Sequence, residues 1–304
     1  MPQTINTNLV SLNAQRNLSA SQLSLSTSMQ RLSSGMRVNS AKDDAAGLAI
    51  AERMNAQARG MNVAMRNAND GISMAQVGEG ALGKVSDIMQ RMRELAVQAS
   101  NGTNSTADRV SLNQEFVQLA QEATRTLSGT QFNGQSVLAA TAPATFQIGA
   151  NNTTDMDRIT VNAFNWSTAA GITDVLGTTV LSGTDVGTYN GVTSTYTAGT
   201  DAPANLITDA ATALTAITNL DASLSAINSQ RATFGAVQNR FDNVVANLMV
   251  SAENQQAARS RIMDADYAVE TANLSRAQIL QQAGNAMVAQ ANQLPQQVLA
   301  LLKG

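Results

Sequence analysis

The chain has 304 residues, of which only 3% are aromatic and 43% are hydrophobic, a composition typical of closely packed helices. With 19 Lys and Arg against 22 Asp and Glu, it lacks the clustered cations that bind nucleic acid. Cys and His are both absent, which excludes disulfides, thiolate zinc sites and Ser–His–Asp or Cys–His catalysis. We expect no cofactor, no Sec-type signal and no membrane span, since no segment approaches ~20 apolar residues.

The first predicted element is a helix with a narrow apolar stripe. Leu18, Leu25 and Leu32 recur every seven residues and Met29 adds a four-residue step, which is the spacing of a coiled-coil seam. So short a seam offers little burial to set against an ordering cost of ~1–2 kcal/mol per residue. We therefore expect this end to be disordered in the monomer and to fold when neighbouring chains cover it. The alternative is an ordinary helical hairpin packed on the body.

Two further helices are predicted before residue 130. Ser40–Asp43 has the form of a capping box, and it opens a long helix that continues to about Gln98. Ser105–Asp108 caps the next helix, which Ser128–Gly129 ends. One face of this second helix carries apolar residues at Leu112, Phe116, Leu119, Ala123 and Leu127.

The composition then shifts to Thr, Gly, Asp and Asn over residues 141–204. Asn133–Gly134 marks a turn, and the β-prone segments 145–148 and 159–161 predict a hairpin. Residues 167–204 are weakly patterned, so we expect a small exposed insert of strands and loops. A third long helix is predicted over 208–250, with an apolar stripe at Leu214, Ile217, Leu220, Leu224 and Ile227.

The C-terminal segment returns to the composition of the first. Its apolar residues follow steps of three, four and seven among Gln and Asn, which indicates a second short seam. The residues of this seam are Ile279, Ala283, Met287, Leu294, Val298 and Leu301. The two ends of the chain thus carry its clearest periodicity, and we expect them to drive self-assembly.

Isolated acidic residues give no convincing chemical site. Asp43 and Asp44 are adjacent, so on a helix they would point about 100° apart, and helix capping explains both. Asp155 and Asp157 lack the further acids and closing Glu of a calcium loop. We predict a structural protein rather than an enzyme.

Long motifs at both ends resemble those of bacterial flagellin, the subunit of the flagellar filament. They cover the two ends of the chain in order and leave the insert without a match. The matching segments are 31–35 (RLSSG), 39–47 (NSAKDDAAG), 66–73 (RNANDGIS), 90–98 (QRMRELAVQ), 131–134 (QFNG), 274–284 (LSRAQILQQAG) and 289–296 (AQANQLPQ).

The resemblance implies a mainly α fold in three parts. Residues 1–42 and 263–304 would pair as the terminal coiled coil of the inner tube. Residues 43–166 and 205–262 would form a helical rod with a β-hairpin in the outer tube, and 167–204 an exposed, variable insert. The terminal helices are expected to order only on assembly.

The resemblance also implies partners and a route out of the cell. The chain would be exported unfolded through the flagellar type III channel and form a secreted, extracellular homopolymer for motility. A flagellar export chaperone would hold the C-terminal segment, and the filament cap and hook-associated junction proteins would meet the polymer. A hook–filament junction protein and a secreted adhesin remain as alternative interpretations.

A receptor surface carries over from the family at three positions. Arg91, Leu95 and Glu115 correspond to residues that Toll-like receptor 5 recognises in some flagellins. An exposed cluster of this composition suits a binding surface. Contacts between protofilaments are the alternative role for the same residues.

Overall fold

The computed structural model describes residues 8–153, 156–162, 164–169, 172–176, 188–190, 195–197 and 207–303. The described chain is mainly α-helical with small antiparallel hairpins, which confirms the predicted fold class. The helices are α1 (Leu9–Ser34), α2 (Ala45–Ser100), α3 (Thr106–Gly129), η1 (Trp166–Thr168), α4 (Ile172–Leu176), α5 (Ala210–Met263) and α6 (Tyr267–Lys303). The strands are β1 (Gln131–Phe132), β2 (Gln135–Ser136), β3 (Ala144–Gln147), β4 (Arg158–Val161), β5 (Thr188–Asn190) and β6 (Thr195–Thr197).

The chain divides into two compact units. Unit 1 comprises Met1–Ala58 and Ala252–Gly304, and unit 2 comprises Arg59–Ser251. These limits lie inside α2 and α5, whereas the predicted boundaries at residues 42 and 263 lie near the ends of those helices. The difference arises because the first turns of α2 and the last turns of α5 pack with the loop that follows α1.

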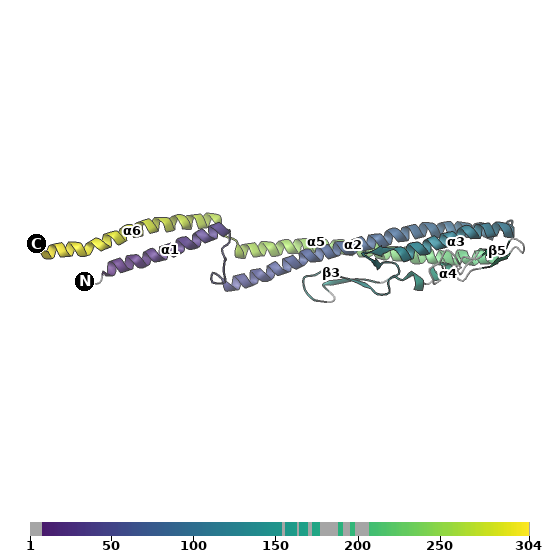
Figure 1. The fold of residues 1–304 in the computed structure, drawn as a ribbon, viewed down its shortest axis with the longest axis horizontal. Helices are drawn as coiled ribbons and strands as arrows, with labels where there is room; N and C mark the ends of the chain where they lie inside the picture. Colours follow the sequence, from purple (N-terminus) through teal and green to yellow (C-terminus); the bar gives the residue numbers. More distant parts are fainter. Residues whose placement is uncertain are drawn as a thin grey trace. The chain divides into compact units, whose positions relative to one another are not determined.

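Unit 1 is built on the antiparallel pair of α1 and α6, which Figure 1 shows side by side. The Asn8 side chain caps α1 by accepting a hydrogen bond from the Ser11 amide, and its Nδ2 donates to the Ala291 carbonyl at 2.7 Å. At the other end of the pair, Arg31 lies 4.0 Å from the buried Glu270. Polar contacts therefore set the register at both ends of an otherwise thin seam.

A tight corner connects α1 to the rest of unit 1. Gly35 ends α1 in the left-handed region with φ 70°, a conformation that favours glycine, and its amide donates to the Arg31 carbonyl. The next residues form a bridge to the end of α5, between Met36 and Asp264. Below this corner Val38, Ala51 and Met263 form a small apolar cluster.

Unit 2 has a continuous core between α2, α3 and α5, which lie side by side (Figure 1). The predicted apolar face of α3 is confirmed. Phe116, Ala123 and Leu127 are fully buried, while Leu112 and Leu119 are partly buried against the core. The predicted capping box is also present, because the Ser105 hydroxyl accepts from the Asp108 amide and the Asp108 carboxylate accepts from the Ser105 amide. This core stabilises unit 2 without any contribution from the ends of the chain.

Close approach of aromatic rings to α2 depends on two glycines. A Cβ on Gly71 would meet the ring of Phe241 at 2.6 Å, and one on Gly78 would meet Phe234 at 2.9 Å. Both rings are buried, and Phe241 also packs edge-to-face on Phe146 with centroids 5.5 Å apart. The glycines thus let two of the few aromatic residues in the chain fill the core.

The hairpins cover part of this core. β1 and β2 pair through Gln131–Ser136 and are joined by Asn133 and Gly134, both at positive φ, as a tight hairpin turn requires. β3 and β4 pair antiparallel from Ala144 opposite Val161 to Gln147 opposite Arg158, close to the predicted segments. Ile159 and Val161 point into the core.

Part of the segment predicted as an exposed insert is buried. Ile172, Val175 and Leu176 of α4 belong to the core of unit 2, together with Trp166, which directly precedes the predicted insert. The segment after the insert also packs on unit 2, where the Ile207 amide donates a hydrogen bond to Oδ1 of the buried Asn113 at 3.0 Å. Most of 177–204 lies outside the described residues.

Two details of the long helices differ from the prediction. α2 begins at Ala45 with Asp44 accepting from the Gly47 amide, whereas Asp43 binds the Asn39 and Ser40 amides and closes the preceding loop. On α5, Leu214 is 59% exposed, and the small residues beside it occupy the core instead. These core residues are Ala213 and Ala216.

Candidate functional site

The face of α6 that packs on α1 has a seven-residue repeat of mostly small residues. Ala277, Gly284 and Ala291 recur every seven residues, and Gly284 takes the Leu18 side chain at 3.1 Å from its Cβ position. Glu270 occupies the preceding position of this repeat, and the intervening positions on the face are Leu274, Gln281 and Val288. The facing residues of α1 are Ser11, Ala14, Leu18, Ser21, Leu25, Ser28 and Leu32, which recur in steps of three and four.

The structure divides the predicted seam residues into two groups. Leu18, Leu25 and Leu32 are half-buried on the face toward α6. The others do not lie in this contact: Met29 is exposed on α1, and Ile279, Ala283 and Met287 are exposed on α6. Leu294, Val298 and Leu301 have side chains outside the described residues. The prediction for α6 was based on its large apolar residues and missed the small ones that pack on α1. The seven-residue repeat of these small residues would have identified them.

Two of these exposed residues of α6, Ala283 and Met287, border a groove that runs along the pair. Its volume is about 330 Å³, and its walls come from both helices. Leu280 and Met287 are 51% and 58% exposed on its α6 side, and Val10 is 54% exposed on its α1 side. The remaining lining residues are Asn13, Ala14, Asn17, Leu18, Ser21 and Gly284. The groove is therefore an open surface, uncharged and mainly apolar, with polar side chains only on its α1 wall.

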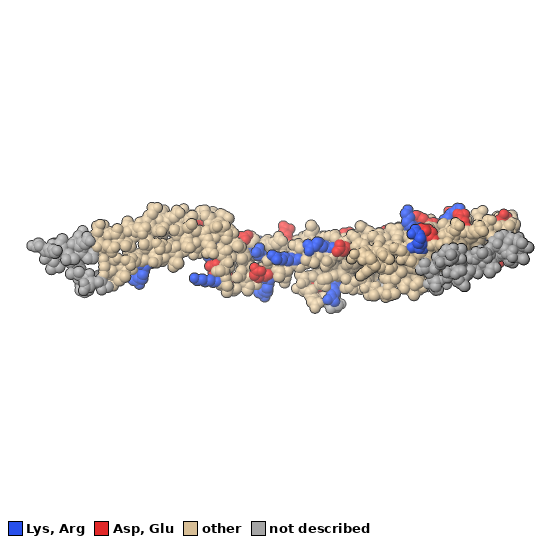
Figure 2. Space-filling view, viewed as in Figure 1, with Lys and Arg blue, Asp and Glu red and all other residues tan. Residues whose placement is uncertain are grey.

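Charge is scarce on this pair of helices. α1 carries only Arg16 and Arg31, and α6 only Glu270, Arg276 and Lys303. Figure 2 accordingly shows few charged side chains on the visible face of the pair and more along unit 2. An exposed apolar surface with so little charge is typical of a protein–protein interface.

The predicted receptor residues lie on α2 and α3 of unit 2. Arg91 donates from Nη2 to Glu115 Oε1 at 2.9 Å and from Nη1 to Glu94 Oε2 at 2.9 Å. The hydrogen bonds that Arg91 donates to Glu94, and then to Glu115, raise the pKa of Arg91 above its ordinary value. Leu95 is only 1% exposed and lies in the core, so the predicted exposed Arg–Leu–Glu cluster is wrong in this residue.

The burial of Leu95 follows from its position on α2. Met89, Met92, Ala96 and Ala99 are all buried in steps of three and four along the same face. This spacing was visible in the sequence and would have placed Leu95 inside. The exposed charged group consists instead of Arg91, Glu94 and Glu115.

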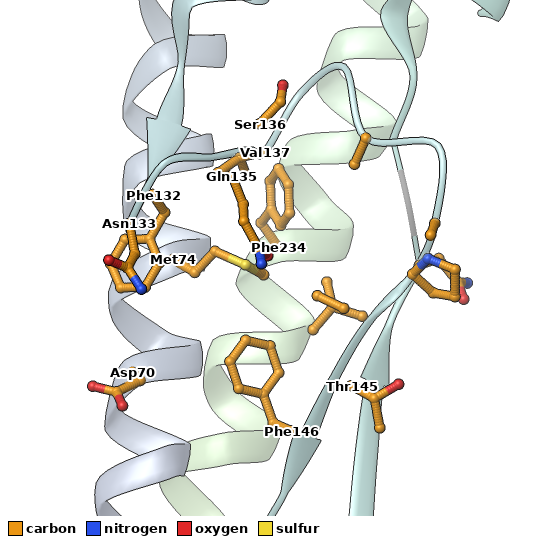
Figure 3. A pocket seen from close by; sticks show the side chains of 16 residues that line it. Asp70, Met74, Phe132, Asn133, Gln135, Ser136, Val137, Thr145, Phe146 and Phe234 are labelled. Carbon is orange, nitrogen blue, oxygen red and sulfur yellow. The ribbon is translucent and has the colours of Figure 1, made fainter.

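A second hollow lies in unit 2 between the hairpins and the helices α2 and α5 (Figure 3). Its volume is about 470 Å³, and Phe132, Phe146 and Phe234 supply aromatic surface to it. Asp70 is the one titratable side chain among its lining residues. The hollow therefore lacks the second acid or base, and the nucleophile activated by one, that hydrolytic chemistry requires.

The described residues contain no group of three or more acidic, His or Cys side chains that could hold a metal ion. Within the same residues, no helix combines the length and apolar character needed to cross a bilayer.

Comparison with known proteins matches both ends of the chain. The bacterial flagellin N-terminal helical region matches residues 5–142, and the bacterial flagellin C-terminal helical region matches residues 217–302. A flagellin of Halalkalibacterium halodurans is 42% identical, over 98% of this chain and 99% of its own length. A flagellin of Serratia marcescens is 43% identical, over the whole of both chains.

Among solved structures, Bacillus cereus flagellin is 33% identical and covers 64% of this chain and 94% of its own, with a TM-score of 0.46. The assignment to a family does not depend on this structure. It rests on the family matches at both ends of the chain and on the full-length relatives. The chain belongs to the bacterial flagellin family, whose members polymerise into the extracellular flagellar filament, and it is a structural protein rather than an enzyme.

Proposed function

We propose that this chain builds the filament through the outward apolar faces of α1 and α6, and that these helices order fully only when other copies cover them. One observation carries the proposal. In the described part of the α1–α6 pair, the buried hydrophobic side chains are Ala277 and Ala291, while the large ones are half-buried or exposed. A fully buried Leu is worth ~1.5–3 kcal/mol, so the pair gains little from its own seam.

The exposed residues of α1 and α6 offer the apolar surface that the seam itself does not bury. More than half of the large hydrophobic side chains that are exposed in the described residues lie on these two helices. Those of α6 are Tyr267, Val269, Ile279, Leu280 and Met287, and those of α1 are Leu9, Val10, Leu12, Leu23 and Met29. Docking a second copy on these faces would remove this surface from water, which offsets the cost of ordering the helices.

Seeded elongation tests this proposal. Monomer is added to short filament fragments at neutral pH, and growth is followed by light scattering and electron microscopy. Leu280→Asp places a charge at the groove without touching the seam, and we expect elongation to slow at least about tenfold. Leu214→Asp, at an equally exposed leucine of α5, is the matched control. Equal elongation by the two variants would contradict a role for the groove.

The same faces bear on the partners in export. We propose that a flagellar export chaperone binds the apolar face of α6 before secretion, and that the filament cap and the hook-associated junction proteins meet the ends of the polymer. The absence of cysteine supports passage of an unfolded chain through a type III channel, because no disulfide would obstruct it. Co-purification of the chaperone with the parent chain but not with Leu280→Asp is the expected result.

We also propose that Toll-like receptor 5 contacts Arg91 and Glu115, which are exposed and joined by an ion pair. Arg91→Ala should weaken binding of the receptor ectodomain about tenfold, as measured by surface plasmon resonance. Arg93→Ala is the matched control, because Arg93 is also on α2 and ion-paired, to Asp221 at 2.7 Å. Equal binding by the two variants would contradict this surface.

A further inference from the structure

One methionine stands in the groove of the α1–α6 pair. Met287 is 58% exposed and lines the groove with Leu280 and Val10. By contrast, Met89 and Met92 are fully buried in unit 2 and Met263 is 5% exposed in unit 1. The chain has no cysteine and its single tryptophan is buried, so exposed thioethers are its most readily oxidised groups.

We propose that Met287 is an oxidation site whose state controls docking of a second copy in the groove, an inference that rests on the proposed function. The oxidant is a peroxide. The sulfur of Met287 attacks one peroxide oxygen, the O–O bond breaks, an S–O bond forms, and the other oxygen leaves as water after proton transfer. The sulfur is oxidised by two electrons and the peroxide is reduced by two.

The product changes the chemistry of the groove. Methionine sulfoxide is polar, and it brings a strong hydrogen-bond acceptor beside the exposed Val10 and Leu280. Docking would have to desolvate that acceptor. The side-chain donors that line the groove all belong to α1, whereas Met287 lies on α6 beside Leu280, Ala283 and Gly284, which have no side-chain donor. Oxidation therefore weakens docking, and reduction of the sulfoxide by a reductase with a dithiol as the electron donor restores it.

The proposed effect depends on where the oxidised methionine lies, not only on how exposed it is. Two other exposed methionines, neither of which lines the groove, allow the effect of position to be tested. Met249 is 60% exposed on α5, almost the same fraction as Met287, but it lies in unit 2 and does not line the groove. Met156 is 81% exposed in unit 2. All three are expected to be oxidised in the free chain, but only oxidation at Met287 changes the groove.

The test oxidises the free full-length chain with hydrogen peroxide, stops the reaction with catalase and measures sulfoxide at each methionine by peptide mass spectrometry. Seeded elongation is then compared for the parent, Met287→Leu and Met249→Leu, each with and without peroxide. We expect peroxide to slow the parent and Met249→Leu about tenfold and to leave Met287→Leu nearly unchanged. Untreated Met287→Gln, which carries a polar group of similar length, should elongate slowly like the oxidised parent.

The outcomes distinguish the two proposals. Treatment with methionine sulfoxide reductases should restore elongation of the oxidised parent, and preformed filaments should protect Met287 but not Met156. Failure of the untreated parent to elongate would contradict the proposed function. Normal untreated elongation with equal loss in the parent and Met287→Leu after peroxide would contradict the methionine site, as would full elongation of a chain oxidised at Met287.

Discussion

The α1–α6 pair and the core of unit 2 are both helical, yet they bury very different side chains. Unit 2 encloses Phe116, Phe234 and Phe241 completely, together with leucines and methionines from α2 and α3. The α1–α6 pair joins half-buried leucines to Ala, Gly, Ser and Gln. One region completes its own core, whereas the other leaves its large apolar residues facing outward.

This difference separates stability from assembly along a single chain. Burial of ~25 cal/mol per Å² favours folding only where the chain itself removes the surface from water. In unit 2 the chain does so. In the α1–α6 pair the apolar surface stays exposed to water, and another copy must cover it before its burial contributes free energy. The two regions should therefore respond differently to substitutions of similar size.

The largest expected effect is loss of a core ring in unit 2. Phe241→Ala leaves a cavity beside Gly71 and removes the edge-to-face contact with Phe146, so we expect a loss of about 3–5 kcal/mol in unfolding free energy. Thermal and urea unfolding of the monomer measure it. The exposed Leu214→Ala on the same helix is the control. A loss below that of the control would mean that unit 2 is not the self-sufficient region.

A smaller effect is expected from filling the seam of the α1–α6 pair. Gly284→Val places methyl groups against Leu18, already 3.1 Å from the Cβ position, and overpacking of this kind costs about 1–3 kcal/mol. Hydrogen exchange of assembled filaments should then quicken in α1 and stay unchanged in α3. Ala286→Val, at an exposed position two residues further along α6, is the matched control for helix propensity. Equal exchange in the two variants would contradict close packing at Gly284.

The same contrast explains how far the sequence predicted the structure. Large residues spaced for a helix, with Ser105 as a cap, predicted α3 correctly because propensity, pattern and burial agree there. At Leu214 they do not agree, because the interface of α5 admits Ala213 and Ala216 and turns the leucine outward. In an interface of small residues, size is a poor guide to which face is buried.

The candidate site was predictable in its location but not in its residues. The periodicity at both ends indicated that α1 and α6 would carry the assembly surface. Gly284 and Ala277, which pack on α1, carry no hydrophobic signal of their own, so the large Ile279 and Met287 drew the prediction to the outer face. Those residues remain candidates for contacts between copies.

The smallest expected effect concerns the helix caps of the self-sufficient region. Hydrogen bonds from the Ser105 hydroxyl, and then from its amide, lower the pKa of Asp108 below its ordinary value of 3.8. Because the folded pKa is the lower one, this stabilisation is present above pH 3.8 and is lost as the pH falls through the folded value. Asp108→Asn removes the charge while keeping the shape of the side chain.

The melting temperature of this variant should therefore lie slightly below that of the parent at pH 7, and the difference should shrink as the pH falls below 3.8. Asp87→Asn is the matched control, since Asp87 is an exposed carboxylate of α2 that makes no hydrogen bond or ion pair within the described chain. A gap between Asp108→Asn and the parent that stays constant into acid would show that the cap acts through shape rather than charge. Because α3 belongs to unit 2, the effect should appear in the melting of the monomer and leave the elongation rate of intact subunits unchanged.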